Sequence, residues 1–267
     1  MDWFDRALRA VAVVAALTVV VVAAMNSQLP LNFSSSAEKE RAPVSGEESR
    51  RQAAAAQTRG YAYLLSSPDH LYPARWCAGT IGFHLDTSLL ADAQLDAAEE
   101  VRRWDKVFQE WSRASQGRYR FSYLGERELT MDSDGEPDVN SVEPGTIGIT
   151  YVHGDTDSGP AEYRSKAVRG RTAGNGGLQV ISRGDSDAGA LLGDRGFVLI
   201  DVDDAAGLAA DGLRRSLYQH ESGHALGLGH VEDDKVLMNG TLSIDRSRIT
   251  ASDEAGLQSL LEMPCVP

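Results

Sequence analysis

Clustered basic residues are absent from this chain, and acidic residues outnumber basic ones. The 267 residues include 26 Lys and Arg against 39 Asp and Glu, which gives a formal net charge of -13 at pH 7. Because binding to a phosphate backbone requires clustered Lys and Arg, this balance argues against a nucleic-acid partner. Hydrophobic residues make up 42% of the chain, so a globular protein with a sizeable core is still expected.

Long apolar runs are also scarce, and the clearest one lies near the N-terminus. Residues 10–25 (AVAVVAALTVVVVAAM) carry no charge and follow Arg6 and Arg9. The length of the run falls between that of a signal-peptide core, about 7–15 residues, and that of a membrane-spanning helix, about 17–25 residues. Residues 1–30 are therefore interpreted as a signal-anchor or a cleaved signal peptide. The basic flank predicts that the rest of the chain is exported, either held outside a single-pass membrane anchor or secreted. The alternative is a buried core helix.

Cysteine is nearly absent too, since only Cys77 and Cys265 occur. In an exported chain an even count favours a disulfide, and this one would tie the start of the folded region to its end. Two unrelated buried thiols are the alternative.

The remaining sequence separates into a polar segment and a folded domain. Residues 31–59 are rich in Ser, Ala and charge and poor in aromatics, which indicates a flexible stalk. Aromatic residues return at Tyr61, so the domain is placed at residues 60–267. Strands are predicted at 80–86, 118–125, 145–153, 178–182 and 196–202, and helices at 91–115 and 213–228. The order predicts an α+β fold, in which a twisted mixed sheet of about five strands has helices mainly on one face.

Two polar segments of the domain are interpreted as irregular structure. Residues 154–177 are rich in glycine and are expected to form a loop. Residues 132–138 (DSDGEPD) contain three Asp, but their spacing does not match an EF-hand loop, and Pro137 stands where the turn glycine belongs. A solvated turn is therefore favoured over a calcium site.

Three of the six histidines fall within residues 220–230 (HESGHALGLGH). His220 and His224 continue an apolar stripe on the predicted helix, and at this spacing both imidazoles can reach one metal ion. Glu221 points to the side of the pair, where a carboxylate can act as a general base without ligating. Glycines 227 and 229 allow the helix to end, so that His230 can return as a third ligand. Three ligands leave a fourth position open, as in catalytic zinc sites. A helix with surface histidines is the alternative.

The motif, followed eight residues later by Met238, resembles the signature of the metzincin metallopeptidases, and most closely that of bacterial matrixin-like proteins. The resemblance extends over about residues 61–267 and includes a final helix within 249–261. It implies a metzincin-like catalytic domain with a long first helix, an active-site helix and a C-terminal helix. His220, His224 and His230 would bind one catalytic Zn²⁺, Glu221 would be the catalytic base, and Met238 would form the apolar floor beneath the metal.

The sequence departs from the family pattern in three places. His153 begins a His-Gly-Asp run like that of a structural zinc site, but the other histidines of such a site are missing. A structural Zn²⁺ or Ca²⁺ is therefore an open alternative. No cysteine that could inhibit the zinc from a propeptide is evident. Asn239 follows Met238 where many relatives have an aromatic residue.

The predicted function is that of an exported zinc-dependent endopeptidase that acts as a monomer on peptide or protein substrates and is associated with the membrane through its N-terminal segment. Two alternatives use the same residues. One is a zinc hydrolase of a non-protein amide such as a cell-wall peptide, and the other is a zinc-containing binding module without turnover.

Overall fold

In a computed structural model, the described residues are 59–65, 73–132, 135–154, 163–168, 172–183, 190–204, 210–263 and 265. The chain divides into two units, Met1–Pro30 and Leu31–Pro267, and all described residues belong to the second. The membrane-targeting segment predicted at residues 1–30 lies outside the described residues, as does nearly all of the predicted stalk. Within the described ranges, no helix is both long enough and apolar enough to cross a membrane.

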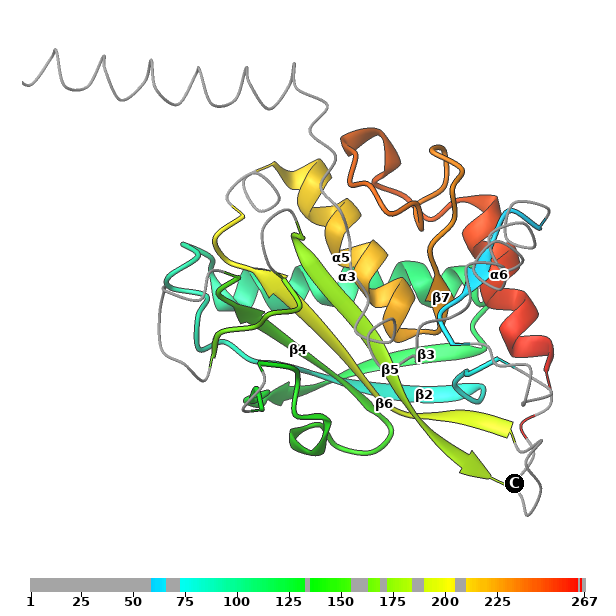
Figure 1. Cartoon of the computed structure of the whole chain (residues 1–267), viewed down its shortest axis with the longest axis horizontal. Coiled ribbons are helices and arrows are strands. Elements are labelled where there is room, and N and C mark those ends of the chain that lie inside the picture. The colour runs from blue at the N-terminus through cyan, green and yellow to red at the C-terminus, as the bar shows by residue number, and fades with distance from the viewer. Residues whose placement is uncertain are drawn as a thin grey trace, which may run out of the picture. The chain divides into compact units, whose positions relative to one another are not determined.

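A five-stranded mixed sheet forms the base of the domain (Figure 1). Its strands are β2 (Gly79–Leu85), β3 (Tyr119–Glu126), β4 (Thr146–Val152), β5 (Gly174–Arg183) and β6 (Ala190–Asp201). In the order β3-β2-β4-β6-β5 the first four strands are parallel, and β5 pairs antiparallel with β6 at one edge. Central β4 (TIGITYV) is buried along its whole length, as expected for an apolar strand in a parallel sheet that is covered on both faces.

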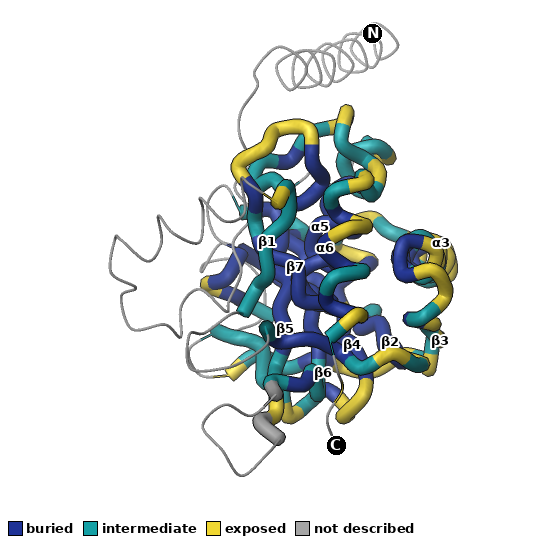
Figure 2. Tube along the Cα trace, turned by 90° about the vertical axis from the view of Figure 1, so that its right-hand side faces the viewer, coloured by how far each residue is buried: buried dark blue, intermediate teal, exposed yellow. Residues whose placement is uncertain are grey.

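Helices α3 (Ala97–Ala114) and α5 (Asp211–Ala225) lie over the same face of the sheet, and α6 (Ala251–Glu262) packs beside them (Figure 1). The outer side of α3 is exposed, whereas α5 is buried along most of its length (Figure 2). The predicted α+β fold, with helices mainly on one face of a five-stranded sheet, is confirmed.

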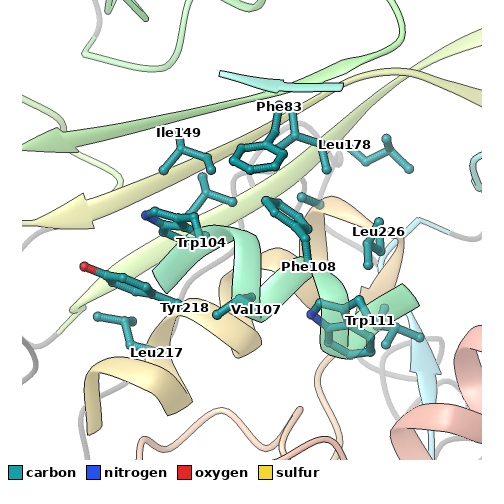
Figure 3. Close-up of a cluster of buried hydrophobic side chains, with 14 of the residues drawn as sticks. Phe83, Trp104, Val107, Phe108, Trp111, Ile149, Leu178, Leu217, Tyr218 and Leu226 are labelled. Atoms are coloured by element: carbon teal, nitrogen blue, oxygen red, sulfur yellow. The ribbon is translucent and has the colours of Figure 1, made fainter. Parts of the chain in front are cut away.

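Aromatic side chains fill the space between the sheet and these helices (Figure 3). Phe83 of β2 contacts Phe108 of α3 with a ring-centroid distance of 4.7 Å, and Trp104 stacks on Tyr218 of α5 at 4.2 Å. Each such buried side chain contributes about 1.5–3 kcal/mol through removal of apolar surface from water. The position of α5 over the sheet is therefore fixed by the core.

The first long helix begins later than the sequence pattern predicts, at Ala97 instead of about Ala91. Asp96 is its N-cap, and the side chain accepts a hydrogen bond of 2.8 Å from the Glu99 N–H. Just before it, Gln94 has a φ of 56°, which an α-helix does not allow. The capping side chain and this left-handed residue stop the helix from extending toward residue 91.

The prediction of a loop through residue 177 is wrong at its end, because β5 already begins at Gly174. Residues Gly174 and Gly176 pair with Ile200 and Val198 of β6. A side chain at Gly174 or Gly176 would collide with α5, so these glycines allow the helix to pack directly on the edge strand. Their low strand propensity hid the strand from the sequence pattern.

A two-stranded ladder forms outside the main sheet. Strand β1 (Ala62–Tyr63), close to the start of the domain, pairs antiparallel with β7 (Leu228–Gly229), which follows α5. Two short 3₁₀ helices, η2 (Val139–Ser141) and η4 (Ile244–Arg246), complete the elements named here. Residues 133 and 134 of the segment 132–138 lie outside the described residues; on either side of them, the Glu136 N–H donates to the Asp132 side chain at 3.0 Å.

Candidate metal centre

The first two histidines of the motif lie one turn apart on α5. His220 and His224 have ring centroids 4.7 Å apart, and their exposed fractions are 1% and 0%. The predicted helix of residues 213–228 is correct in type, but it ends at Ala225 with Leu226 as its C-cap. The apolar stripe that ends in these two residues thus faces the protein interior, which excludes the alternative of surface histidines on this helix.

The chain then reverses so that the third histidine approaches the other two. Gly227 has a φ of +101°, a conformation that side chains strongly disfavour, and a Cβ at this position would lie only 2.9 Å from the Ala74 carbonyl oxygen. Strand β7 follows, and then His230. Glycine at this position therefore allows the helix to end and also allows the segment at Ala74 to pack closely against the turn.

The three Nε2 atoms of His220, His224 and His230 form a triangle with all sides equal to 3.1 Å. They are the one group of three potential metal ligands found among the described residues. The centre of such a triangle lies about 1.8 Å from each nitrogen, close to the zinc–nitrogen bond length of about 2.0–2.1 Å. A single small cation therefore fits among these atoms.

Hydrogen bonds at the opposite ring atoms orient two of the imidazoles. His220 Nδ1 lies 2.8 Å from the Leu237 carbonyl oxygen, and His224 Nδ1 lies 2.7 Å from that of Leu228. A carbonyl only accepts, so each Nδ1 carries the proton and each Nε2 presents a lone pair to the centre. Converging lone pairs repel one another unless a cation lies between them, and the donor set therefore fits zinc.

The charge state of the three rings agrees with this role. Burial, with the neighbouring imidazoles, lowers the pKa of His220 well below its usual value and that of His224 to about 3. Burial alone lowers the pKa of His230 to about 4. All three rings are therefore neutral at pH 7, which is the form that binds metal.

Glu221 lies on α5 next to the edge strand β5. Its side chain is 0% exposed, and its Cγ would be 2.8 Å from a Cβ built on Gly174. Neither carboxylate oxygen has a partner in good hydrogen-bonding geometry. Burial raises the pKa of Glu221 well above its usual range, and the Gly176 N–H opposes this only in part. The carboxyl group is thus buried beside the histidines with neither oxygen engaged by another described residue.

Met238 packs against α5 from below. It is 2% exposed, and its Sδ lies so close to the helix that a Cβ on Gly223 would be 2.5 Å away. The N–H groups of Leu237 and Met238 donate to the Asp253 carboxylate at 3.3 and 3.2 Å. Since the Leu237 carbonyl holds His220, the turn around Met238 joins α6 to the metal centre.

Residues 200–262, which include the whole centre, match the Matrixin family model. The chain is matrixin-like. This match supports a metalloprotease of the matrixin type, with zinc as the implied metal.

Solved structures add a more distant likeness. Metalloproteinase-II from Bacteroides fragilis is 16% identical, with a TM-score of 0.40 over 78% of this chain and 61% of that one. The matrixin-like chain thus spans less than two thirds of the length of that structure. The search of curated proteins found no match to this chain.

The two cysteines of the matrixin-like chain are joined in the structure. A disulfide connects Cys77 and Cys265, whose Cα atoms are 5.7 Å apart. It links the segment just before β2 to the end of the chain after α6.

The His-Gly-Asp run does not complete a second metal centre within the described residues. His153 is buried, and its Nδ1 lies 3.1 Å from Asp203 Oδ1. Asp155 lies outside the described residues, and so does His70. His84 is held elsewhere, with Nδ1 3.2 Å from the Gly125 carbonyl oxygen. A structural metal is therefore not supported by the part of the chain that the structure describes.

Two residues that support the centre were missed by sequence analysis. Asp253 forms a capping box with Thr250 at the start of α6, and a Thr three residues before an Asp is a signal that could have predicted the cap. Trp76 donates its indole N–H to the Ala225 carbonyl oxygen at 2.8 Å. Nothing local in the sequence predicts that contact, because it joins residues 149 positions apart.

Proposed function

We propose that the chain is an exported zinc-dependent endopeptidase, with His220, His224 and His230 as the metal ligands and Glu221 as the general base. The observation that carries this proposal is the triangle of three Nε2 atoms, two of them fixed in the correct tautomer. The matrixin match over residues 200–262 supports the same reaction class.

His220, His224 and His230 would hold a zinc ion, which would supply Lewis acidity by lowering the pKa of a water toward about 7 and polarising the substrate carbonyl group. Glu221 accepts a proton from the attacking water as the oxygen bonds to the scissile carbonyl carbon. It then delivers that proton to the nitrogen of the leaving amine as the carbon–nitrogen bond breaks. Both carboxylate oxygens of Glu221 are buried without a hydrogen-bond partner among the described residues, so they are available first to the water and then to the amine.

Peptide substrates are favoured by the position of the edge strand. Among the described residues, strand β5 has β6 on one side only, and α5 packs on it at Gly174 and Gly176. An extended peptide can pair with such an open strand edge through its backbone. A peptide bound there would run past Glu221.

The proposed organisation follows the sequence. Residues 1–30 target the chain to the membrane as a signal-anchor or signal peptide, residues 31–59 form a stalk, and residues 60–267 form a monomeric peptidase domain on the outer side. A binding module without turnover is less well supported, because a buried carboxylate beside the ligands has no purpose in it.

Cleavage of a diverse fluorogenic peptide library by the full chain loaded with zinc tests the proposal. We expect cleavage that stops on chelation and falls by about 10³-fold or more in Glu221→Ala, in keeping with the loss of a general base. The variant should retain one zinc per chain. Zinc binding without cleavage of any peptide would overturn the endopeptidase assignment and leave a non-protein amide substrate or a binding module.

A further inference from the structure

The segment between the second and third histidines contains little that could hold its own shape. Residues 225–229 run from the last residue of α5 through Gly227 to the end of β7. Two of these five residues are glycine, which has the greatest backbone freedom of any residue. Left alone, this segment would let His230 move away from His220 and His224.

Backbone pairing from the start of the domain restrains this segment. Ala62 pairs with Gly229 and Tyr63 with Leu228, and the Leu64 N–H donates to the Gly227 carbonyl oxygen at 2.8 Å. Three consecutive residues are thus held by residues more than 160 positions earlier in the chain.

The indole of Trp76 restrains the other end of the segment. Its N–H donates to the Ala225 carbonyl oxygen at 2.8 Å, and the side chain is 5% exposed. The last carbonyls of a helix lack partners within the helix, so this bond satisfies a group that would otherwise be buried without one. The Ala74 carbonyl lies against Gly227 in between.

The restrained segment acts on two ligands. The Leu228 carbonyl oxygen accepts from His224 Nδ1 and so sets the orientation of that ring. Gly229 directly precedes His230 and sets where its backbone begins. A shift of residues 225–229 would therefore change the direction of one imidazole and the position of another.

We propose that Trp76 and strand β1 with Leu64 are positioning residues of the metal centre, which hold His224 and His230 in the geometry that binds zinc. This inference rests on the proposed function in that the ion is zinc. It adds that the affinity of the site for zinc depends on residues 62–64 and on Trp76, which are not among its ligands. Holding the ligands in place before the ion binds lowers the entropic cost of ordering them.

The test compares two buried tryptophans in the full chain loaded with zinc. Trp76→Phe removes the N–H that restrains Ala225 and keeps an aromatic ring. Trp104→Phe is the matched control, because Trp104 is also buried and the substitution removes an indole N–H that donates to Tyr151 Oη at 3.3 Å, outside the segment. Zinc loss is followed as transfer to a chromophoric chelator, and ligand geometry is followed by the visible spectrum of the Co²⁺-substituted chain.

We expect Trp76→Phe to lose zinc on the order of 10-fold faster than the parent and to change the Co²⁺ spectrum, as substitutions that support ligands from outside do. Trp104→Phe should match the parent in both. Equal rates in all three chains, or equal increases in both variants, would overturn the proposal.

Leu64→Pro provides a second variant that does not touch the tryptophan, since proline cannot donate to the Gly227 carbonyl. It should also lose zinc faster, and a rate equal to that of the parent would contradict the role of β1. Peptidase activity enters none of these measurements. A parent that binds zinc but cleaves no peptide would therefore overturn the proposed function alone, whereas a parent that binds no zinc would overturn both.

Discussion

Two regions of the molecule pair histidine with acidic residues, and among the described residues only one of them brings together a candidate metal centre. At residues 220–230, three Nε2 atoms converge at 3.1 Å. At His153, the ring meets one carboxylate, with Nδ1 3.1 Å from Asp203 Oδ1, and no group of three potential ligands forms around it among the described residues. The difference teaches that a helix period and a glycine turn fix several ligands relative to one another, whereas a short His-Gly-Asp run fixes only one.

The electrostatics of the two regions also differ. Burial lowers the pKa of the three clustered histidines, so that they stay neutral and can bind a cation. Near His153, burial raises the pKa of Asp201 from 3.8 to about 7, although the N–H groups of Asp203 and Gly154 lower it. The three histidines are thus neutral and can bind a cation, whereas the region of His153 contains a carboxyl group that is difficult to ionise.

Removing one histidine from each region gives the largest expected contrast. His224→Ala should abolish stoichiometric zinc binding and lower peptide cleavage by about 10³-fold or more, because two ligands do not hold a catalytic zinc. His153→Ala should keep one zinc per chain and nearly the full rate. Metal analysis and initial rates of both variants check this, and zinc loss from His153→Ala would mean that the second region also binds metal.

The second-largest expected effect is a dependence of the unfolding free energy on pH that arises from ionisation of Asp201. An acid with a raised pKa keeps its proton in the folded state while the unfolded chain releases it, so its contribution to stability is present below pH 4 and is lost as pH rises to about 7. Asp201→Asn cannot ionise and should gain roughly 2–4 kcal/mol relative to the parent across this range. Chemical unfolding of both chains at pH 4 and pH 8 measures the difference. A constant difference would contradict the raised pKa.

Packing beneath each region gives the smallest expected effects. Gly223→Ala would push on Met238 Sδ, 2.5 Å from the added Cβ, and should cost about 1–3 kcal/mol of unfolding free energy. Gly154→Ala is the matched change beside Asp201 and should also destabilise the chain. Only Gly223→Ala should alter the Co²⁺ spectrum, because Met238 follows Leu237, whose carbonyl holds His220. Identical spectra for both variants and the parent would show that the packing of Met238 does not affect the geometry of the metal ligands.

The sequence predicted what depends on regular spacing. His220 and His224 follow from the helix period, and β2, β3 and β4 lie within one residue of the predicted bounds. Strand β6 begins at Ala190, six residues before its predicted start at 196. The start of β5 was not predicted because the close approach of α5 requires glycine at positions 174 and 176, and glycine has a low strand propensity.

Contacts between distant segments were not predictable in the same way. The ladder of β1 and β7 has only two residue pairs, which leaves no alternating pattern to read. The bond from Trp76 to Ala225 exists only once the sheet and α5 are in place. The start of α3 was mislocated because the cap at Asp96 competes with an apolar pattern that continues before it.

The link between Cys77 and Cys265 spans 188 positions of sequence and encloses every ligand of the proposed zinc site. It makes most of the domain a covalently closed ring. If the proposed peptidase activity cuts one backbone bond inside that ring, the two pieces stay attached. A nicked chain would keep its mass on a gel without reductant and separate into fragments only after reduction, so apparent integrity under oxidising conditions says little about how often the backbone has been cut.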